Sequence, residues 1–383
     1  MSPTSSSANG PMRLFDTARR EIVPFEPGPV VTMYTCGITP YDATHLGHAA
    51  VFVTYDVLQR RLRDLGHETR CVRNITDVDD PLLAKANELG IHYLDLAAGE
   101  VARFDEDMKA LGQLPVYSTP RATSAIGEIR KVVAELVDNA NAYVTDDGHV
   151  FFDVTTAPNF GHISHYDEAT MLEYAAERGG NPDDPRKRNR LDFVLWQPSA
   201  EGEPAWESLW GPGRPGWHIE CTALARRELD ADTIDLHGGG SDLIFPHHEC
   251  SSAQSETLTG QPLARHWMHQ AMVRMDGEKM SKSLGNLVFV SALRDQWDPM
   301  AIRLLLVSEH YRTPWEWYDD RIVEADERLR RWRAAGEGEG ALDDVRRALD
   351  EDLDTPAAVA AIDAAVSRGE GVSRAAILLG VAL

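Results

Sequence analysis

Residues 29–66 read PVVTMYTCGITPYDATHLGHAAVFVTYDVLQRRLRDLG, and this stretch decides the fold. It begins with an apolar, β-branched run, passes through a Gly/Pro turn and continues with apolar residues at helical spacing, which predicts strand, loop and helix. Residues 67–90 repeat the scheme, with Cys71, Val72 and Ile75 in a strand and Asp79 and Asp80 at the start of the next helix. Two successive β-α units predict a parallel, doubly wound α/β sheet that binds its ligand at the carboxyl ends of the strands.

The rest of the chain predicts an interruption of this fold and a helical end. AYVTDDGHVFFDVTT (residues 142–156) predicts a hairpin that turns at Asp147-Gly148, within an insertion. LDFVLWQP (191–198) and DTIDLHGGG (232–240) are predicted to return to the core sheet, with GWHIECTALARREL (216–229) as a helix between them. Residues after KMSKSLGN (279–286) are predicted to be mostly helical.

We therefore expect five segments. They are a flexible tail (1–10), a Rossmann-like catalytic domain in two halves (11–105 and 190–270), an inserted connective domain (106–189), a stem region that carries KMSKS (271–320) and a short helical C-terminal domain (321–383). At about 100 to 200 residues per domain, a chain of 383 residues has room for this arrangement.

Composition favours a small substrate over a polyanion. Lys and Arg total 38 against 61 Asp and Glu, a formal charge of -23, so the average surface repels phosphate backbones. No long apolar run or secretory leader is present, and we expect a cytoplasmic protein without a membrane partner. Its cysteines, Cys36, Cys71, Cys221 and Cys250, are too few and too scattered for a disulfide framework, which indicates reduced thiols and leaves metal binding open.

Two short motifs can handle phosphate. In THLGHAA, His45 and His48 lie three residues apart where a loop enters a helix, so both rings can lie near the positive helix N-terminus. In KMSKS, Lys279 and Lys282 can follow charge that develops on leaving phosphates. Each motif alone also fits an ordinary core or surface pair, or a solvated turn. In this order and separated by an insertion, they resemble the HIGH and KMSKS signatures of class I aminoacyl-tRNA synthetases.

Longer stretches resemble the cysteinyl-tRNA synthetases within that class. They are TCGITPYD (35–42), NITDVDD (74–80), PGWHIECTAL (215–224), HGGGSDLIFPHHE (237–249) and KMSKSLGN, and the resemblance covers about Pro11 to Trp317. It implies the class I Rossmann-like parallel sheet with an inserted connective domain and a C-terminal helical region. It also implies one zinc ion per chain, held by Cys36, Cys221 and His247.

Thiolates and an imidazole are ligands that suit zinc, and three protein ligands leave one position for the sulfur of a substrate. A direct bond to sulfur separates cysteine from serine better than an apolar pocket does. One departure concerns the glutamate that can complete the shell in the synthetases, because Ser251 stands in its place. Cys250 could be the fourth zinc ligand in its place or an ordinary buried thiol, and Cys71 fits the core better than a metal site. For His248 the sequence leaves three roles open: support of a metal ligand, contact with the nucleotide, or a structural role.

The same resemblance implies the substrate contacts. Thr39 and Trp217 occupy positions that contact cysteine or close over it, and Gly240, Ser241 and Asp242 occupy the stretch that holds the adenylate. The full set predicted to contact cysteine or the adenylate is Cys36, Gly37, Ile38, Thr39, Val51, Asn74, Ile75, Thr76, Trp217, Gly240, Ser241, Asp242 and Val273.

Further details resemble the cysteine ligases of mycothiol biosynthesis more than the synthetases. These are ITPYDATHLGHAA (38–50), DVDDPLLAKA (77–86), WESLWGPGRPGWHIECTAL (206–224) and ERGGNP (177–182), in which Asn181 departs from the Asp of that family. ERGGNP also fits a simple helix end at Gly179-Gly180. Fewer than a hundred residues follow Asn286, which leaves little room for an anticodon-reading domain. These residues include acidic stretches and no basic surface with interleaved aromatic residues that could bind RNA.

The resemblance therefore implies an ATP-dependent ligase. With Mg-ATP it would activate L-cysteine as cysteinyl-adenylate, with His45, His48, Lys279 and Lys282 as catalytic residues. It would then pass the cysteinyl group to the amine of glucosaminyl-inositol and release AMP. We expect no tRNA partner and a monomer or weak dimer. The alternatives are a truncated cysteinyl-tRNA synthetase and a non-enzymatic, zinc-stabilised nucleotide-binding paralogue.

Overall fold

The computed structural model describes residues 11–42, 44–280 and 285–383. Its central sheet has the strand order β10-β9-β3-β4 and is parallel throughout. The strands are β3 (Val30–Ile38), β4 (Glu68–Ile75), β9 (Leu236–Gly240) and β10 (Trp267–Gln270). The predicted β-α units of residues 29–90 and the parallel α/β fold class are confirmed.

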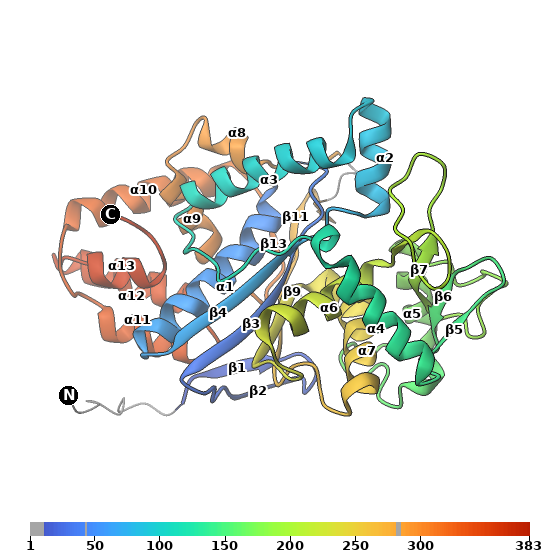
Figure 1. Cartoon of the computed structure of the whole chain (residues 1–383). Helices are drawn as coiled ribbons and strands as arrows, with labels where there is room; N and C mark the ends of the chain where they lie inside the picture. Colours follow the sequence, from blue (N-terminus) through green and yellow to red (C-terminus); the bar gives the residue numbers. More distant parts are fainter. Residues whose placement is uncertain (1–10, 43, 281–284) are drawn as a thin grey trace.

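Both faces of this sheet are covered. Successive side chains along a strand point to opposite faces, and Met33 of β3 belongs to the core around α1 (Leu46–Asp64) whereas its neighbour Tyr34 belongs to the core around α6 (Trp217–Leu229). Both helices contact the sheet, and Figure 1 shows α1 and α6 beside β3 and β4. Helices thus cover both faces of the sheet, and the chemistry-bearing residues lie at its edge, at the carboxyl ends of β3 and β9.

Strands of the insertion and of the residues that follow it build a second, antiparallel sheet. Its order is β5-β6-β7-β8, with β5 (Ala142–Val144), β6 (Val150–Phe152), β7 (Phe193–Pro198) and β8 (Gly213–Pro215). The predicted hairpin is confirmed, because β5 pairs antiparallel with β6 across Asp147-Gly148. The prediction for LDFVLWQP is wrong: this run forms β7, which pairs with β6 and β8 and not with the core strands. A short apolar run predicts a buried strand but does not tell which sheet contains it.

Helices account for most of the remaining structure. Between β4 and β5 lie α2 (Asp80–Leu89), α3 (Tyr93–Ala110) and α4 (Ile126–Asp138), while α5 (Glu168–Glu177) follows β6 and α7 (Glu249–Thr259) follows β9. After β11 (Val273–Met275) and β12 (Glu278–Lys279) the chain is mostly helical, as predicted, with one short strand, β13 (Trp315–Glu316). Before β13 come α8 (Val290–Arg294) and α9 (Pro299–Val307), and after it come α10 (Asp319–Ala335), α11 (Leu342–Asp350), α12 (Thr355–Ser367) and α13 (Ser373–Leu378). A hairpin of β1 (Arg13–Asp16) and β2 (Glu21–Pro24) precedes the sheet.

A buried ion pair ties the C-terminal helices to the catalytic core. Arg303 of α9 and Asp56 of α1 are both fully buried, and the guanidinium donates to the Asp56 carboxylate and to the carbonyls of Leu111 and Leu379. Burial alone would raise the pKa of Asp56, but Arg303 and Arg60 outweigh it and lower that pKa. The contact fixes α9 against the helix that carries the histidine pair.

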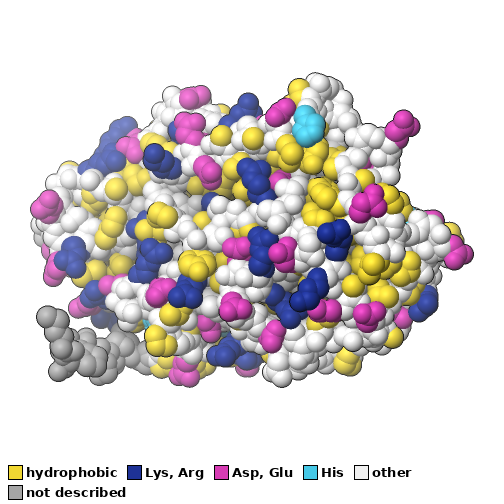
Figure 2. All heavy atoms as spheres, viewed as in Figure 1, with side chains coloured by type: hydrophobic (Ala, Val, Ile, Leu, Met, Phe, Trp, Pro, Cys, Tyr) yellow, Lys and Arg dark blue, Asp and Glu magenta, His cyan; other side chains and the backbone are white. Residues whose placement is uncertain are grey.

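In the described parts of the chain, no helix has both the length and the apolarity needed to span a membrane. On the face shown in Figure 2, Lys and Arg side chains are interspersed with Asp and Glu side chains. The surface thus lacks a continuous basic area on that face.

Candidate active site

Three soft donor residues meet at the end of the parallel sheet. Cys36 lies near the end of β3, Cys221 lies in the second turn of α6, and His247 lies just before α7. One ligand atom from each can be chosen so that all three lie within 4.8 Å of one another, and the two sulfurs are 3.9 Å apart. All three residues are buried. The predicted triad is therefore brought together by elements that are far apart in the sequence.

The His247 ring is held in one orientation. Trp217 stacks on it with ring centroids 4.3 Å apart, and its Nδ1 lies 3.0 Å from Nδ1 of His218. Its Nε2 is buried and, among the described atoms, has no hydrogen-bond partner. A buried imidazole nitrogen without a partner is costly unless something binds it, and in metal sites the other ring nitrogen is commonly the one fixed by a neighbour.

The two cysteines differ in acidity. Burial raises the pKa of the Cys36 thiol, whereas the hydrogen bond from Cys36 lowers the pKa of Cys221 well below its usual value, with a further contribution from His247. The arrangement thus favours a thiolate on Cys221, and a thiolate is the form that binds a metal.

A second donor group shares Cys36. It consists of Cys36, His237 and His248, whose chosen ligand atoms also lie within 4.8 Å of one another. His248 places Nε2 3.2 Å from the Cys36 sulfur and Nδ1 2.7 Å from Nε2 of His269. His248 therefore contacts the triad directly, a role that the sequence left open. The first group offers two sulfurs and the second offers one, and two sulfurs with an imidazole form a donor set typical of zinc sites.

Neither candidate for a fourth protein ligand joins these groups in the described structure. Cys250 is buried in the first turn of α7 and belongs to neither. The Ser251 hydroxyl donates to the carbonyl of His247 at 2.9 Å, so it caps the backbone behind the ring. The buried-thiol interpretation of Cys250 and Cys71 fits both positions.

A cleft of about 600 Å³ opens over the triad. Eleven of the residues predicted to act in catalysis or binding line it, namely Cys36, Gly37, Ile38, Thr39, His45, His48, Val51, Trp217, Gly240, Asp242 and Val273. Cys221 and His247 are buried next to lining residues, because Cys221 contacts Cys36 and His247 stacks on Trp217. The volume and the mix of apolar walls with few polar groups are typical of a small-molecule site.

The histidine pair lies at the start of α1. His45 is the N-cap residue and accepts a hydrogen bond from the His48 backbone N–H at 3.4 Å, and the two rings stack with centroids 3.8 Å apart. The backbone around His45 pairs with the segment that follows KMSKS, because Leu46 N–H donates to the carbonyl of Val288 at 2.9 Å. The predicted histidine motif thus pairs with the segment that follows KMSKS, and Met280 of that motif lines the cleft. The backbone of Lys279 lies in β12, its side chain is outside the described part, and Lys282 lies outside the described residues.

Gly37, Asn74 and Thr76 support the floor of the cleft from two strands. The Gly37 N–H donates to Oδ1 of Asn74 at 2.9 Å, and Nδ2 of Asn74 donates to the Thr76 hydroxyl at 3.0 Å. A Cβ atom at Gly37 would lie 1.6 Å from the Asn74 carbonyl oxygen, so only glycine allows this approach. Asn74, Ile75, Thr76 and Ser241 are not among the lining residues of the cleft, and their predicted contacts remain predictions.

Comparison with known proteins identifies the family. The family of tRNA synthetases class I (C) catalytic domain matches residues 22–327. A relative from Nakamurella multipartita is 51% identical over 92% of this chain and 90% of its own length. It carries the name L-cysteine:1D-myo-inositol 2-amino-2-deoxy-alpha-D-glucopyranoside ligase, as does a relative from Thermobispora bispora that is 49% identical over 97% of this chain and 96% of its own. The chain belongs to this ligase family.

Solved structures extend the likeness to the class I fold. Methionyl-tRNA synthetase of Mycobacterium tuberculosis, in complex with methionyl-adenylate, has a TM-score of 0.66 and 17% identity, and the match covers 88% of this chain and 82% of that one. The protein is thus a ligase with the class I fold, and this fold implies use of ATP.

Sequence reasoning missed part of the site of this ligase. The cleft is also lined by Tyr41, Phe52, Leu243, Gln270, Ala271, Met272 and Met280, none of which was predicted, and by Gly47, which lies between His45 and His48 in the predicted motif. Tyr41 lies inside the motif TCGITPYD and could have been included from its position. Gln270, whose Oε1 accepts from the Thr54 hydroxyl at 2.6 Å, comes from the end of a strand whose sequence has no motif.

Proposed function

We propose that the enzyme joins L-cysteine to the 2-amino group of glucosaminyl-inositol in mycothiol biosynthesis, with ATP converted to AMP and pyrophosphate. The observation that carries the proposal is the buried Cys36-Cys221-His247 group, whose Cys36 lines a cleft of small-molecule size. The stacked histidine pair lines the same cleft, so sulfur recognition and phosphate chemistry fit within one site.

The donor set fits zinc, with Cys36, Cys221 and His247 as the three protein ligands. Bound there, zinc would accept the substrate sulfur in its open position and would supply the selection of cysteine over serine. The chain itself contributes the geometry: Trp217 and His218 hold the His247 ring, and Trp217 forms part of the cleft wall.

In the first step, the carboxylate of cysteine attacks the α-phosphorus of Mg-ATP, a P–O bond forms, and the bond to pyrophosphate breaks. His45 and His48, at the N-terminus of α1, are proposed to stabilise charge on the phosphates together with Lys279 and Lys282. Gly240 and Asp242 are proposed to hold the adenylate, because both line the cleft and Gly240 has no side chain to obstruct it.

In the second step, the sugar amine attacks the carbonyl carbon of cysteinyl-adenylate, a C–N bond forms, and AMP leaves with the electron pair of the broken C–O bond. We propose a small acceptor and not tRNA. The formal charge of -23 and the interspersed acidic and basic side chains of Figure 2 support this, because tRNA binding requires a sustained basic surface.

An acceptor assay tests the proposal. AMP formation is measured with ATP and cysteine, and either glucosaminyl-inositol or cysteine tRNA is added. We expect AMP release to depend on the amino sugar and to be unaffected by tRNA. Dependence on tRNA alone would support a truncated synthetase. Absence of cysteine-dependent exchange of pyrophosphate into ATP would support a protein that binds nucleotide without catalysis.

A pair of variants tests which donor group holds the metal. His247→Ala should lose zinc, whereas His237→Ala should keep it, because only His247 belongs to the group with two sulfurs. Both histidines are buried, so the comparison controls for the loss of a buried ring. Zinc retained by His247→Ala and lost by His237→Ala would overturn the assignment.

A further inference from the structure

The insertion holds both ends of the short segment that carries His247. The segment runs from Phe245 to Glu249, between the core strand β9 and helix α7. We propose that Arg178 and Glu249 are positioning residues that fix His247 for metal binding, and thereby for recognition of cysteine. This inference rests on the proposed metal role of His247, and it assigns a function to the ERGGNP motif.

Arg178 fixes the first end of the segment. It lies directly after α5 within ERGGNP, and its guanidinium donates to the carbonyl of Phe245. The guanidinium also lies over the ring of Tyr174, 4.6 Å from the centroid. The Gly180 N–H donates to the carbonyl of Ala175 at 2.8 Å and ends the helix. From this helix end the side chain of Arg178 reaches the carbonyl of Phe245. The motif is therefore both a helix end and an anchor.

The carbonyl of Phe245 needs such a donor. Phe245 is extended (φ -140°, ψ 137°) between residues of helical conformation, so the regular helical ladder is interrupted there. Its side chain is buried, with Tyr166 and Phe160 in edge contact at centroid distances of 6.4 and 6.2 Å. A buried backbone carbonyl without a partner costs free energy comparable to a lost hydrogen bond.

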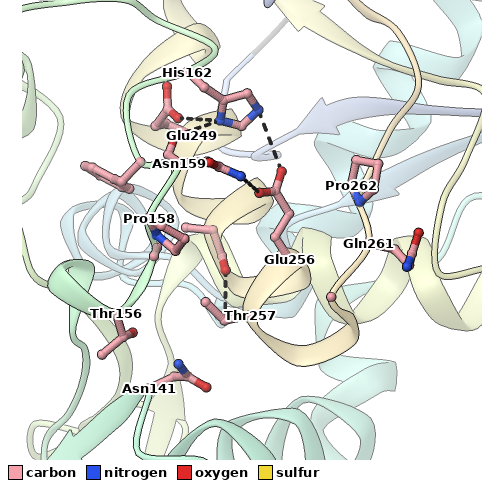
Figure 3. Close-up of a pocket in the computed structure, with 14 residues that line it drawn as sticks. Asn141, Thr156, Pro158, Asn159, His162, Glu249, Glu256, Thr257, Gln261 and Pro262 are labelled. Atoms are coloured by element: carbon pink, nitrogen blue, oxygen red, sulfur yellow. Dashed lines mark hydrogen bonds and ion pairs between the residues drawn. The ribbon is translucent and has the colours of Figure 1, made fainter.

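Glu249 fixes the second end. Its carboxylate is buried and accepts backbone N–H groups of Gly161, Ile163 and Ser164 at 2.8, 3.1 and 2.9 Å. His162 lies between Glu249 and Glu256 of α7, with nitrogen–oxygen distances of 3.4 and 3.6 Å. Figure 3 shows this contact in the wall of a cavity between the insertion and α7. The loop and the first turns of α7 are thus held together by three backbone N–H donors from residues 161–164 and by the His162 ring.

The three residues between the two anchors are Pro246, His247 and His248. Both anchors attach them to the insertion, whereas Cys36 and Cys221 belong to the core sheet and its covering helix. The insertion thus fixes the backbone at both ends of the segment, in addition to the core contacts that Trp217 and His218 make with the His247 ring. Loss of one anchor should move His247 relative to the two sulfurs. It should not affect the nucleotide end of the cleft, where His45 and His48 lie on α1.

The test compares Arg178→Ala with Arg130→Ala. Arg130 is a matched control, because it is also a half-buried arginine that donates to a backbone carbonyl, that of Glu207. For Arg178→Ala we expect zinc affinity, measured by competition with a chelator, to fall about 10- to 100-fold, the range for residues that orient metal ligands. We also expect a raised KM for cysteine and an unchanged KM for ATP in pyrophosphate exchange. Arg130→Ala should change none of these.

Two further measurements keep the inference testable if Arg178→Ala folds poorly. Arg178→Lys keeps a charged donor and should recover part of the zinc affinity, which a purely steric role would not predict. Hydrogen exchange at the amides of residues 245–249 should quicken in either Arg178 variant and not in Arg130→Ala. Equal zinc affinity, cysteine KM and exchange in the Arg178 and Arg130 variants would overturn the inference. A zinc-free wild type would instead overturn the proposed function, while the exchange result would still report on the anchors.

Discussion

Replacement of Cys221 by serine removes one of the two sulfurs beneath the cleft. Cys221 is 1% exposed, and its sulfur lies 3.9 Å from that of Cys36, so serine fits the space but leaves a hydroxyl where a thiolate is favoured. Changes to residues that only orient metal ligands cost about 10- to 100-fold in affinity. Loss of a ligand itself should weaken zinc binding by more than about 100-fold, which at about 1.4 kcal/mol per factor of ten is more than about 2.8 kcal/mol of binding free energy.

Two assays follow this change. Zinc affinity is measured by competition with a chelator, and amino acid selection is measured by pyrophosphate exchange with cysteine and with serine. Selection should fall toward the roughly 100-fold that an apolar pocket can provide between such isosteres. Cys71→Ser is the control, because Cys71 is also buried, lies in β4 next to the strand of Cys36, and belongs to neither metal group. The reasoning is refuted if Cys221→Ser retains full zinc affinity and selection, or if Cys71→Ser loses them equally.

Two further changes test the floor of the cleft and its attachment to the C-terminal helices. Gly37→Ala should force the strands apart and lower kcat/KM for adenylate formation, because a Cβ would lie 1.6 Å from the Asn74 carbonyl oxygen. Gly28→Ala is the control and should leave kcat/KM unchanged, because a Cβ there meets nothing within 4 Å. Equal activity of the two variants would contradict this prediction. Arg303→Ala should lower the free energy of unfolding by about 3–5 kcal/mol in a denaturant titration, because it leaves the Asp56 carboxylate buried and unpaired. Because the pKa of Asp56 is lowered in the folded state, the stability that the ion pair contributes should be complete above the unfolded pKa of about 3.9 and be lost as pH falls through the folded pKa. The stability difference between the wild type and Arg303→Ala should therefore shrink at low pH, and a constant difference would refute the linkage.

The parallel sheet could be predicted because its signals are local. Residues 29–90 carry two strand-loop-helix units, and their apolar patterns differ clearly between strand and helix. The assignment of LDFVLWQP to that sheet was wrong, because β7 pairs with β6 through residues that are far apart in the sequence, such as Val150 with Trp196. Periodicity reports the burial of a strand and carries no information about its partner.

The site was predictable to a similar extent. Cys36, Cys221 and His247 could be selected because each lies in a motif with a family resemblance, and they meet in space. His248 and Arg178 also lie in such motifs, but the motifs do not show that His248 contacts Cys36 or that Arg178 donates to the carbonyl of Phe245. Both contacts depend on the angle at which one element crosses another, which the sequence of neither element contains.

X-ray absorption at the zinc edge of the purified enzyme, with and without L-cysteine, tests the central claim most directly. The account predicts stoichiometric zinc with two sulfur ligands and one imidazole ligand from the protein, and a third sulfur at about 2.3 Å once cysteine is added. Zinc whose sulfur count does not change on addition of cysteine, or an enzyme that selects cysteine without any metal, would contradict it.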